Sequence, residues 1–182
     1  GFYNESALGT TSAGLDKGVV RAPERVYGVE ATLDVTPVQR LNLGGTFTWT
    51  EGENDANEDG VYLPLNTFRI QPLKLTGYVQ HATRPGWTNR LQVLYSGRRD
   101  RAFEERANPN AVGFGERAVD SYLVVDFIST FDVGPGTFKV GIENLLNAQY
   151  YPVVSQLLWN GRNSSFAAAP GATLTLGYRV TY

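Results

Sequence analysis

Short and long connections alternate along this chain, between segments in which apolar and polar residues alternate. The short connections lie near Pro37, at 84–86 and at 134–136, where Pro and Gly gather. The long connections cover about 52–67, 100–118 and 146–171. A chain that crosses a membrane up and down in a barrel makes short turns on one side and long loops on the other. The alternation therefore favours a membrane barrel over other folds.

The segments between these connections have the two-residue period of β-strands. One face of the segment that begins at Tyr27 is apolar (Tyr27, Val29, Ala31, Leu33 and Val35), and the residues between them are mostly polar. Seven such segments follow residue 20, and a doubtful strand from Gly1 to about Leu8 makes eight. Clean segments cover about 9–11 residues, the length of a tilted membrane strand, whereas the strands of soluble sandwiches are nearer to 5–6. The prediction is an all-β, antiparallel, up-and-down transmembrane β-barrel segment of about 7–8 long strands.

One segment, 73–83, fits this pattern poorly. It places Tyr78 on the polar face and His81 on the apolar face. His81 is the only histidine and the chain has no cysteine, so a metal site or a catalytic role for it is not expected.

Composition excludes several classes of function. Lys and Arg (16) nearly balance Asp and Glu (18), so nothing indicates a nucleic-acid partner. Without cysteine there is no disulfide framework. Apolar runs end within a few residues, so no membrane-spanning helix is expected. Neither a phosphate-binding loop nor a nucleophile–base pair is found, so we expect no cofactor and no enzymatic activity.

Strand parity gives the direction of the loops. If Tyr182 ends on the periplasmic side, the last strand begins outside and loop 146–171 is external. Counting back makes loops 100–118, 52–67 and 9–23 external as well. The Pro and Gly turns are then periplasmic.

Two sequence motifs are more specific. Ile142-Glu143-Asn144-Leu145-Leu146-Asn147, followed by Tyr150-Tyr151, resembles the Asn-Leu-(x)n-Tyr signature in the last loop of TonB-dependent outer-membrane receptors. Arg25-Val26-Tyr27-Gly28-Val29-Glu30 resembles an Arg-x-x-Gly-x-Glu strand of the same family, and the strand that ends at Tyr182 resembles its terminal assembly signal. The segments 87–92 and 95–97 are most similar to the ferric-siderophore branch. The residues that carry the family motif are Asn144, Leu145, Tyr150, Tyr151 and Tyr182.

The resemblance implies a function and several partners. Receptors of this family have a barrel of about 22 strands around a plug. Residues 1–182 would be the C-terminal barrel segment, without the plug domain, of a receptor that imports ferric siderophores across the bacterial outer membrane. Expected partners are a ferric siderophore or related iron chelate, outer-membrane lipid and, through the plug, the TonB energy-coupling complex. The alternatives are a stand-alone eight-stranded outer-membrane anchor or adhesin, and a soluble β-barrel that binds a small ligand.

An acidic loop provides the one incomplete metal motif. Asp55, Asn57 and Asp59 match the first half of a calcium loop, but its twelfth position is Asn66 instead of Glu. With Glu51 and Glu53, the loop carries five carboxylates, which could bind a hard cation loosely. We expect this segment to be a solvated external loop, and calcium binding is the alternative.

Arginines gather at the start of loop 100–118. Arg98, Arg99 and Arg101, with Arg106 and Arg117, form either a charge network with nearby acids (Asp100, Glu104, Glu105 and Glu116) or a binding site for an anionic ferric chelate. Asn144 and Tyr150 are expected to fix the shape of the last loop rather than to perform chemistry.

Overall fold

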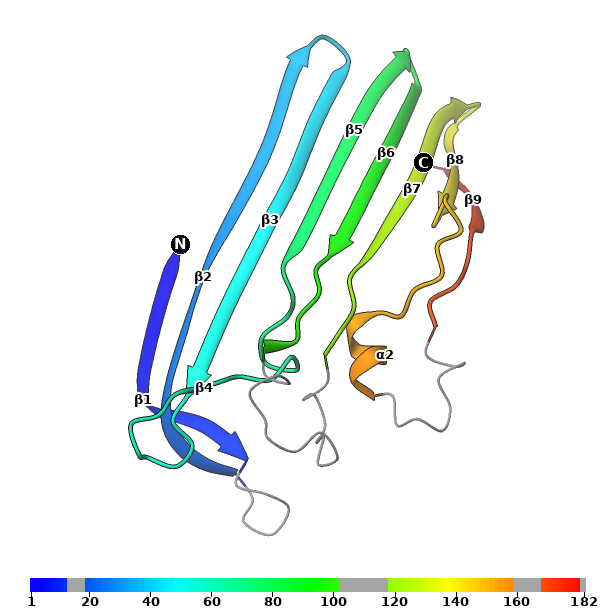
Figure 1. Cartoon of the computed structure of the whole chain (residues 1–182). Coiled ribbons are helices and arrows are strands. Elements are labelled where there is room, and N and C mark those ends of the chain that lie inside the picture. The colour runs from blue at the N-terminus through cyan, green and yellow to red at the C-terminus, as the bar shows by residue number, and fades with distance from the viewer. Residues whose placement is uncertain (13–18, 102–117, 159–167, 181–182) are drawn as a thin grey trace.

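The described part of the chain folds into one curved antiparallel sheet and a short helix (Figure 1). The computed structural model describes residues 1–12, 19–101, 118–158 and 168–180. Its strands are β1 (Phe2–Ser12), β2 (Val19–Val38), β3 (Leu41–Asn54), β4 (Leu63–Pro64), β5 (Lys74–Arg84), β6 (Trp87–Ser96), β7 (Tyr122–Val133), β8 (Gly136–Glu143) and β9 (Thr173–Val180), and its helix is α2 (Val153–Leu158).

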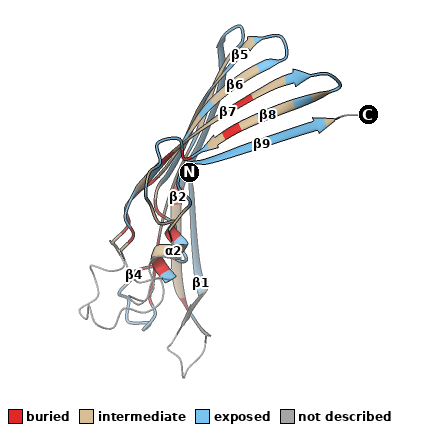
Figure 2. Cartoon of the chain, turned by 90° about the vertical axis from the view of Figure 1, so that its right-hand side faces the viewer, coloured by how far each residue is buried: buried red, intermediate tan, exposed pale blue. Residues whose placement is uncertain are grey.

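The strand order follows the order of the chain. The sheet runs β1-β2-β3-β5-β6-β7-β8-β9, every pair is antiparallel, and β4 pairs only with β3. This confirms the predicted all-β, up-and-down architecture. Within the described ranges β1 and β9 do not pair with each other, and they form the opposite edges of the sheet (Figures 1 and 2). The described chain is therefore a curved wall and not a closed small barrel.

The register joins the apolar residues of successive strands into one face. Directly paired residues of neighbouring strands point to the same side of a sheet. One row of such pairs crosses seven strands and is apolar throughout: Val35, Leu43, Val79, Leu91, Phe127, Ile142 and Leu174.

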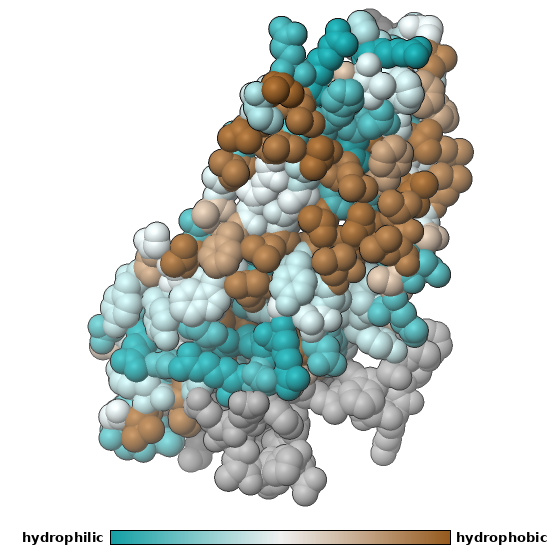
Figure 3. Space-filling view, turned by 45° about the horizontal axis from the view of Figure 1, so that its top comes forward, coloured by the Kyte–Doolittle hydropathy of each residue, from teal (hydrophilic) through white to brown (hydrophobic). Residues whose placement is uncertain are grey.

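Nothing in the described chain covers this apolar face. Leu33 is 62% exposed and Leu174 is 63% exposed. Figure 3 shows the apolar side chains as a band with hydrophilic side chains at both ends. An apolar surface of this extent requires an apolar environment or partner, and hydrocarbon meets that requirement on the scale of a whole sheet face.

The small buried core lies near the long loops. Val119 is fully buried and packs with Val153 and Leu157 of α2 and with Tyr122. The sequence reading missed this helix inside loop 146–171. Its signals are Pro152, directly before the first helical residue, and apolar residues four positions apart. The described helices include none that could cross a membrane.

One predicted connection is shifted by two residues, and another is wrong. The first short turn is at 39–40, where Arg40 has a φ of 71°, and Pro37 lies inside β2. Pro37 is tolerated there because the pairing with β3 is irregular between Val35 and Val38, so the missing N–H breaks no regular ladder. The predicted loop 9–23 is also mostly strand, because β1 and β2 remain paired as far as Ser12 and Val19. The doubtful first strand is therefore real.

Contacts across β5 explain the poor pattern of 73–83. The Tyr78 hydroxyl donates to Asp34 Oδ2 at 2.5 Å, and the Arg90 guanidinium lies 3.8 Å from the centre of the Tyr78 ring. The ring occupies the space that a side chain at Gly44 would need. The polar face thus accommodates Tyr78 as a hydrogen-bonding residue, paired with a glycine on β3.

Candidate functional site

The face opposite the apolar band carries polar side chains that bond across strands. Gln92 Nε2 donates to Asp126 Oδ2 at 3.0 Å, and the hydroxyls of Thr46 and Thr76 lie 2.7 Å apart. A barrel wall that alternates apolar outside and polar inside has this arrangement. The polar face is therefore the side that would line a barrel interior.

At the end of β8 the chain turns through Asn144, which is buried and has a φ of 51°. This left-handed conformation is tolerated by Asn better than by most other residues. The Asn144 side-chain amide donates to the carbonyls of Ala148 (2.8 Å) and Pro170 (3.1 Å), and its Oδ1 accepts from Ala148 N (2.9 Å). The Asn144 backbone N–H donates to Asp126 Oδ1 at 2.9 Å.

A second asparagine completes this corner. Asn147 also has a left-handed backbone (φ 49°), and its Oδ1 accepts from Ala172 N at 2.9 Å. Because Asn144 and Asn147 each reach the far end of the loop, the two ends of loop 146–171 are fixed together. We call Asn144 and Asn147 with these partners the Asn144 corner, and it stabilises the base of this loop.

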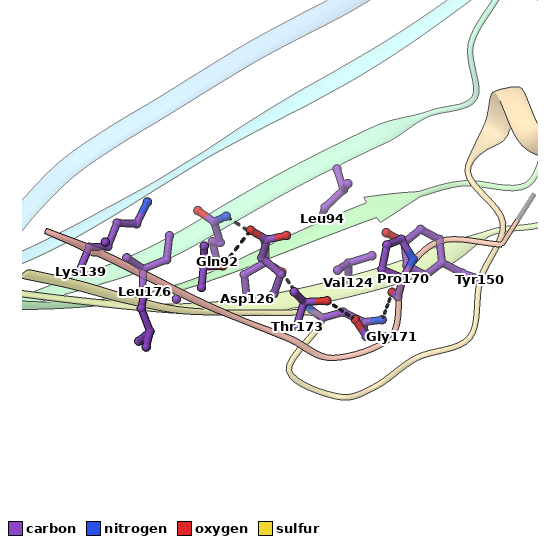
Figure 4. A pocket seen from close by; sticks show the side chains of 16 residues that line it. Gln92, Leu94, Val124, Asp126, Lys139, Tyr150, Pro170, Gly171, Thr173 and Leu176 are labelled. Atoms are coloured by element: carbon purple, nitrogen blue, oxygen red, sulfur yellow. Dashed lines mark hydrogen bonds between the residues drawn. The ribbon is translucent and has the colours of Figure 1, made fainter.

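The corner closes one end of a hollow on the polar face (Figure 4). The hollow has a volume of about 480 Å³ and is lined mainly by β6 to β9. Its polar lining includes Gln92, Asp126, Lys139, Glu143, Asn144 and Tyr150.

Tyr150 forms part of this lining and stacks on Tyr122, with ring centres 4.7 Å apart. Burial, with the neighbouring Tyr122, Asp126 and Glu143, raises the pKa of the Tyr150 phenol above its ordinary value. The phenol is therefore kept protonated and neutral.

Gln156 ties two long loops to each other. From α2, its Oε1 accepts from Asp120 N (2.7 Å), and its Nε2 donates to the carbonyls of Asp120 (3.1 Å) and Tyr151 (2.8 Å). The segment that follows loop 100–118 is thus joined to loop 146–171. The sequence reading did not single out Gln156, because a lone helical glutamine has no distinctive pattern.

The predicted arginines lie at the loop end of the sheet, and two of them bond to β3. Arg99 is 5% exposed, pairs with Glu51 and donates to the Leu65 carbonyl at 3.0 Å. Arg101 bridges Glu51 (3.3 Å) and Glu53. Burial lowers the pKa of Arg101, but its contacts with Tyr27, Glu51 and Glu53 outweigh burial and leave that pKa above the ordinary value.

This set of contacts extends to β2. Arg25 donates to Glu53 Oε2 through Nη2 at 2.6 Å, and its guanidinium lies 4.3 Å from the centre of the Tyr62 ring. We call Arg25, Glu51, Glu53, Arg99 and Arg101 the rim network. It links β2, β3 and the segment after β6, and it uses carboxylates that the sequence reading had assigned to the acidic loop.

The remaining arginines are arranged differently. Arg98 is exposed and pairs with Asp100 at 2.9 Å. Arg106 and Arg117, together with Glu104, Glu105 and Glu116, lie outside the described residues. Of the three predicted ligand arginines, Arg99 is buried and already bonded to Glu51 and to the Leu65 carbonyl. Arg101 is partly exposed, and Arg98 is the most exposed to solvent.

The acidic loop uses its carboxylates to hold its own turn. Asp55 Oδ1 accepts from Asp59 N (3.1 Å) and Oδ2 from Gly60 N (2.8 Å), and Asp59 Oδ1 accepts from Val61 N (2.9 Å). In the described part of the chain, no three His, Asp or Glu residues gather as a metal site. Asp55, Asn57 and Asp59 are thus placed in a self-bonded turn.

Similarity to known proteins places this architecture in a family. A family model described as "TonB dependent receptor-like, beta-barrel" matches residues 2–145. The chain belongs to the TonB-dependent receptor family. The predicted family is therefore confirmed.

The curated relatives of this TonB-dependent receptor chain include ferric aerobactin receptors from Escherichia coli and Klebsiella pneumoniae. Each is 30% identical over 139 residues, which cover 76% of this chain and 17% of the relative. The chain thus spans about a sixth of the length of these relatives.

Solved structures support the barrel fold. The copper transporter OprC matches with a TM-score of 0.67 at 13% identity, over 91% of this chain and 25% of that protein. The ferric-catecholate import receptor Fiu from Escherichia coli K12 matches with a TM-score of 0.64 at 16% identity, over 96% of this chain and 23% of that protein. At these identities the likeness shows the fold alone.

The residues of the family motif have different environments. Asn144 is buried, Tyr150 stacks on Tyr122, and the carbonyl of Tyr151 accepts a hydrogen bond from Gln156 Nε2. Leu145 is 39% exposed, and its backbone N–H donates to the Val125 carbonyl at 2.7 Å. Tyr182 lies outside the described residues.

Proposed function

We propose that this chain is the C-terminal barrel segment of an outer-membrane receptor that imports a ferric siderophore. The observation that carries the proposal is the two-sided sheet: a continuous exposed apolar face backs a hydrogen-bonded polar face. Such a sheet suits a barrel wall between lipid and a polar interior. The family and the iron chelate named for the curated relatives support iron uptake.

Loop architecture supports the proposed division of roles. Loops 52–67, 100–118 and 146–171 would face outward and contribute to capture of the chelate, and the short turns would face the periplasm. The plug and the energy-coupling contact with TonB would be supplied by other parts of the receptor. The proposed role is transport without covalent chemistry.

Two other functions are less well supported by the structure. A stand-alone eight-stranded anchor or adhesin would need the sheet to close, whereas β1 and β9 form separate edges in the described chain. A soluble ligand-binding barrel would have to expose the apolar band to water, at a cost of roughly 25 cal/mol for each Å² of apolar surface.

Iron uptake in cells tests the proposal. A strain that lacks its own siderophore receptors would receive the complete receptor that contains this segment. We expect growth under iron limitation when ferric aerobactin, or another ferric siderophore, is the sole iron source, and accumulation of radioactive iron. Copper accumulation without iron accumulation would contradict the proposed cargo. Cleavage of loop 52–67 by external protease only after the outer membrane is broken would contradict the orientation.

A further inference from the structure

Three polar residues interrupt the apolar face close to the β5–β6 turn. The register pairs His81 with Asn89 and Asn89 with Ser129, so all three are on the side of the apolar band. Polar side chains on a lipid-facing surface are unfavourable unless they are hydrogen-bonded or lie at the boundary with water. Their position therefore needs a physical reason.

Hydrogen bonds fix these side chains in place. Asn89 Nδ2 donates to Thr83 Oγ1 at 2.8 Å, and His81 Nδ1 lies 3.3 Å from the same oxygen. Trp87 Nε1 donates to Ser129 Oγ at 2.9 Å. An indole held at the margin of an apolar band is typical of the membrane–water boundary. The cluster therefore marks the height of lipid headgroups on the short-turn side.

The same margin carries an exposed cation that makes no ion pair with the described residues. The register pairs Arg84 with Trp87, and Arg84 is exposed with no ion pair among the described residues. The acids at this end of the sheet belong to the polar face: Asp34 accepts from Tyr78, and Asp132 accepts from Thr137 at 3.1 Å. An exposed cation that is paired in register with Trp87 and makes no ion pair in the described chain complements an anionic group.

We propose that Arg84, His81 and Trp87 form a binding site for the phosphate headgroup of an anionic phospholipid in the leaflet beside the short turns. Arg84 supplies charge to the phosphate, and His81 supplies a hydrogen bond through the ring nitrogen that does not face Thr83. Trp87 packs against the glycerol and upper acyl region. The inference rests on the membrane placement given under Proposed function, but not on the identity of the transported chelate.

Lipid binding to the complete receptor tests this site. The receptor would be purified in detergent, stripped of lipid and titrated with dioleoyl phosphatidylglycerol or dioleoyl phosphatidylcholine, with bound lipid counted by native mass spectrometry. We expect preference for phosphatidylglycerol and a loss of about fivefold in its affinity in Arg84→Gln, since a cation near a lipid surface contributes about 1 kcal/mol. Arg84→Lys keeps the charge and should restore most of the affinity.

Matched variants separate this site from general charge effects. Arg179→Gln removes a cation from the polar face, where the register pairs Arg179 with Thr137, and should leave phosphatidylglycerol binding unchanged. Equal affinity in Arg84→Gln and wild type, or an equal loss in Arg179→Gln, would overturn the proposal. Displacement of the lipid by inorganic phosphate at the same concentration would instead indicate a free-anion site and also overturn it.

Cell assays keep this inference separate from the proposed function. If the receptor fails to accumulate iron but still prefers phosphatidylglycerol in an Arg84-dependent manner, the transport proposal alone fails. If iron uptake is normal and no lipid preference is found, the headgroup site alone fails.

Discussion

The two ends of the sheet are held together by different means. At the short-turn end, backbone conformation makes the turns: Arg40, Gly86 and Gly134 all have positive φ (71°, 71° and 57°). At the loop end, side chains from segments far apart in sequence make the structure, through the rim network, the Asn144 corner and the Gln156 contacts.

This difference separates local from long-range information. A turn of two residues depends on a few backbone angles that a neighbouring Pro or Gly can set. A loop base depends on contacts that exist only after the strands are paired. Substitutions at the loop end should therefore have larger effects on stability than substitutions at the turns.

The largest effect is expected for Arg99→Ala. The change leaves Glu51, whose side chain is 12% exposed, with only the longer contact to Arg101, and leaves the Leu65 carbonyl without its guanidinium donor. Removing one partner of a buried ion pair destabilises by about 3–5 kcal/mol, and we expect about 3 because Arg101 remains. Urea unfolding of the protein in detergent micelles measures this. The control Arg98→Ala breaks an exposed pair and should change the free energy of unfolding by less than about 1 kcal/mol; equal effects would refute the ranking.

Asn144→Ala should follow, with a loss of about 2–3 kcal/mol in the free energy of unfolding, because it removes three partly buried hydrogen bonds of a buried side chain and leaves a left-handed backbone without Asn. Asn144→Gly removes the same bonds but tolerates the φ of 51°, so it should be about 1 kcal/mol less harmful than Ala. The same unfolding measurement compares the two. Identical values for Gly and Ala would show that the backbone angle contributes nothing.

A smaller effect, about 1 kcal/mol, is expected for Gln156→Ala, whose hydrogen bonds are partly exposed to water. Amide hydrogen exchange at Asp120 should accelerate because its N–H loses the Oε1 acceptor. Gln156→Glu keeps an acceptor but loses the two donated bonds, so it should protect the Asp120 amide and still weaken the loop. Unchanged exchange in Gln156→Ala would contradict the proposed link between the loops.

The smallest change in the free energy of unfolding, a gain instead of a loss, is expected at the short-turn end. Arg40→Gly relieves a left-handed conformation that is unfavourable by about 1–2 kcal/mol for non-glycine residues, but it also increases the freedom of the unfolded chain. We expect a net gain of about 0.5 kcal/mol in the free energy of unfolding. A loss would show that the Arg40 side chain has a structural role beyond its turn.

Sequence patterns predicted what depends on local periodicity. The two-residue period gave the architecture, and Pro85-Gly86 and Gly134-Pro135 gave two of the three short turns. The remaining short turn, predicted near Pro37, lies at 39–40 because β2 continues past that proline through an irregular pairing with β3. Loop 9–23 misled because its polar and glycine-rich composition hid strands that are stabilised only by pairing with each other.

The candidate site was less predictable for a physical reason. The sequence indicated that Arg99 and Arg101 were candidate site residues. Their partners, Glu51 and Glu53, are remote in sequence and were assigned to the calcium-like loop. Asn144 was found through a family motif, whereas Asp126, which accepts its backbone N–H, gave no signal. Long-range pairs of this kind become visible only when the strand register is known.

The consecutive strand order also has a consequence for how the chain folds. Apart from the short β4, strands that are neighbours in the sheet are also consecutive along the chain, so hairpins joined by two-residue turns can form early with little loss of chain entropy. The slower steps are those that close loops 97–121 and 144–172, which must bring distant segments into register. The Arg99–Val119 backbone pair and the Asn144 corner sit at the closing points of these two loops. The residues that fix the loops in the native protein therefore also lie where these two loop closures are completed during folding.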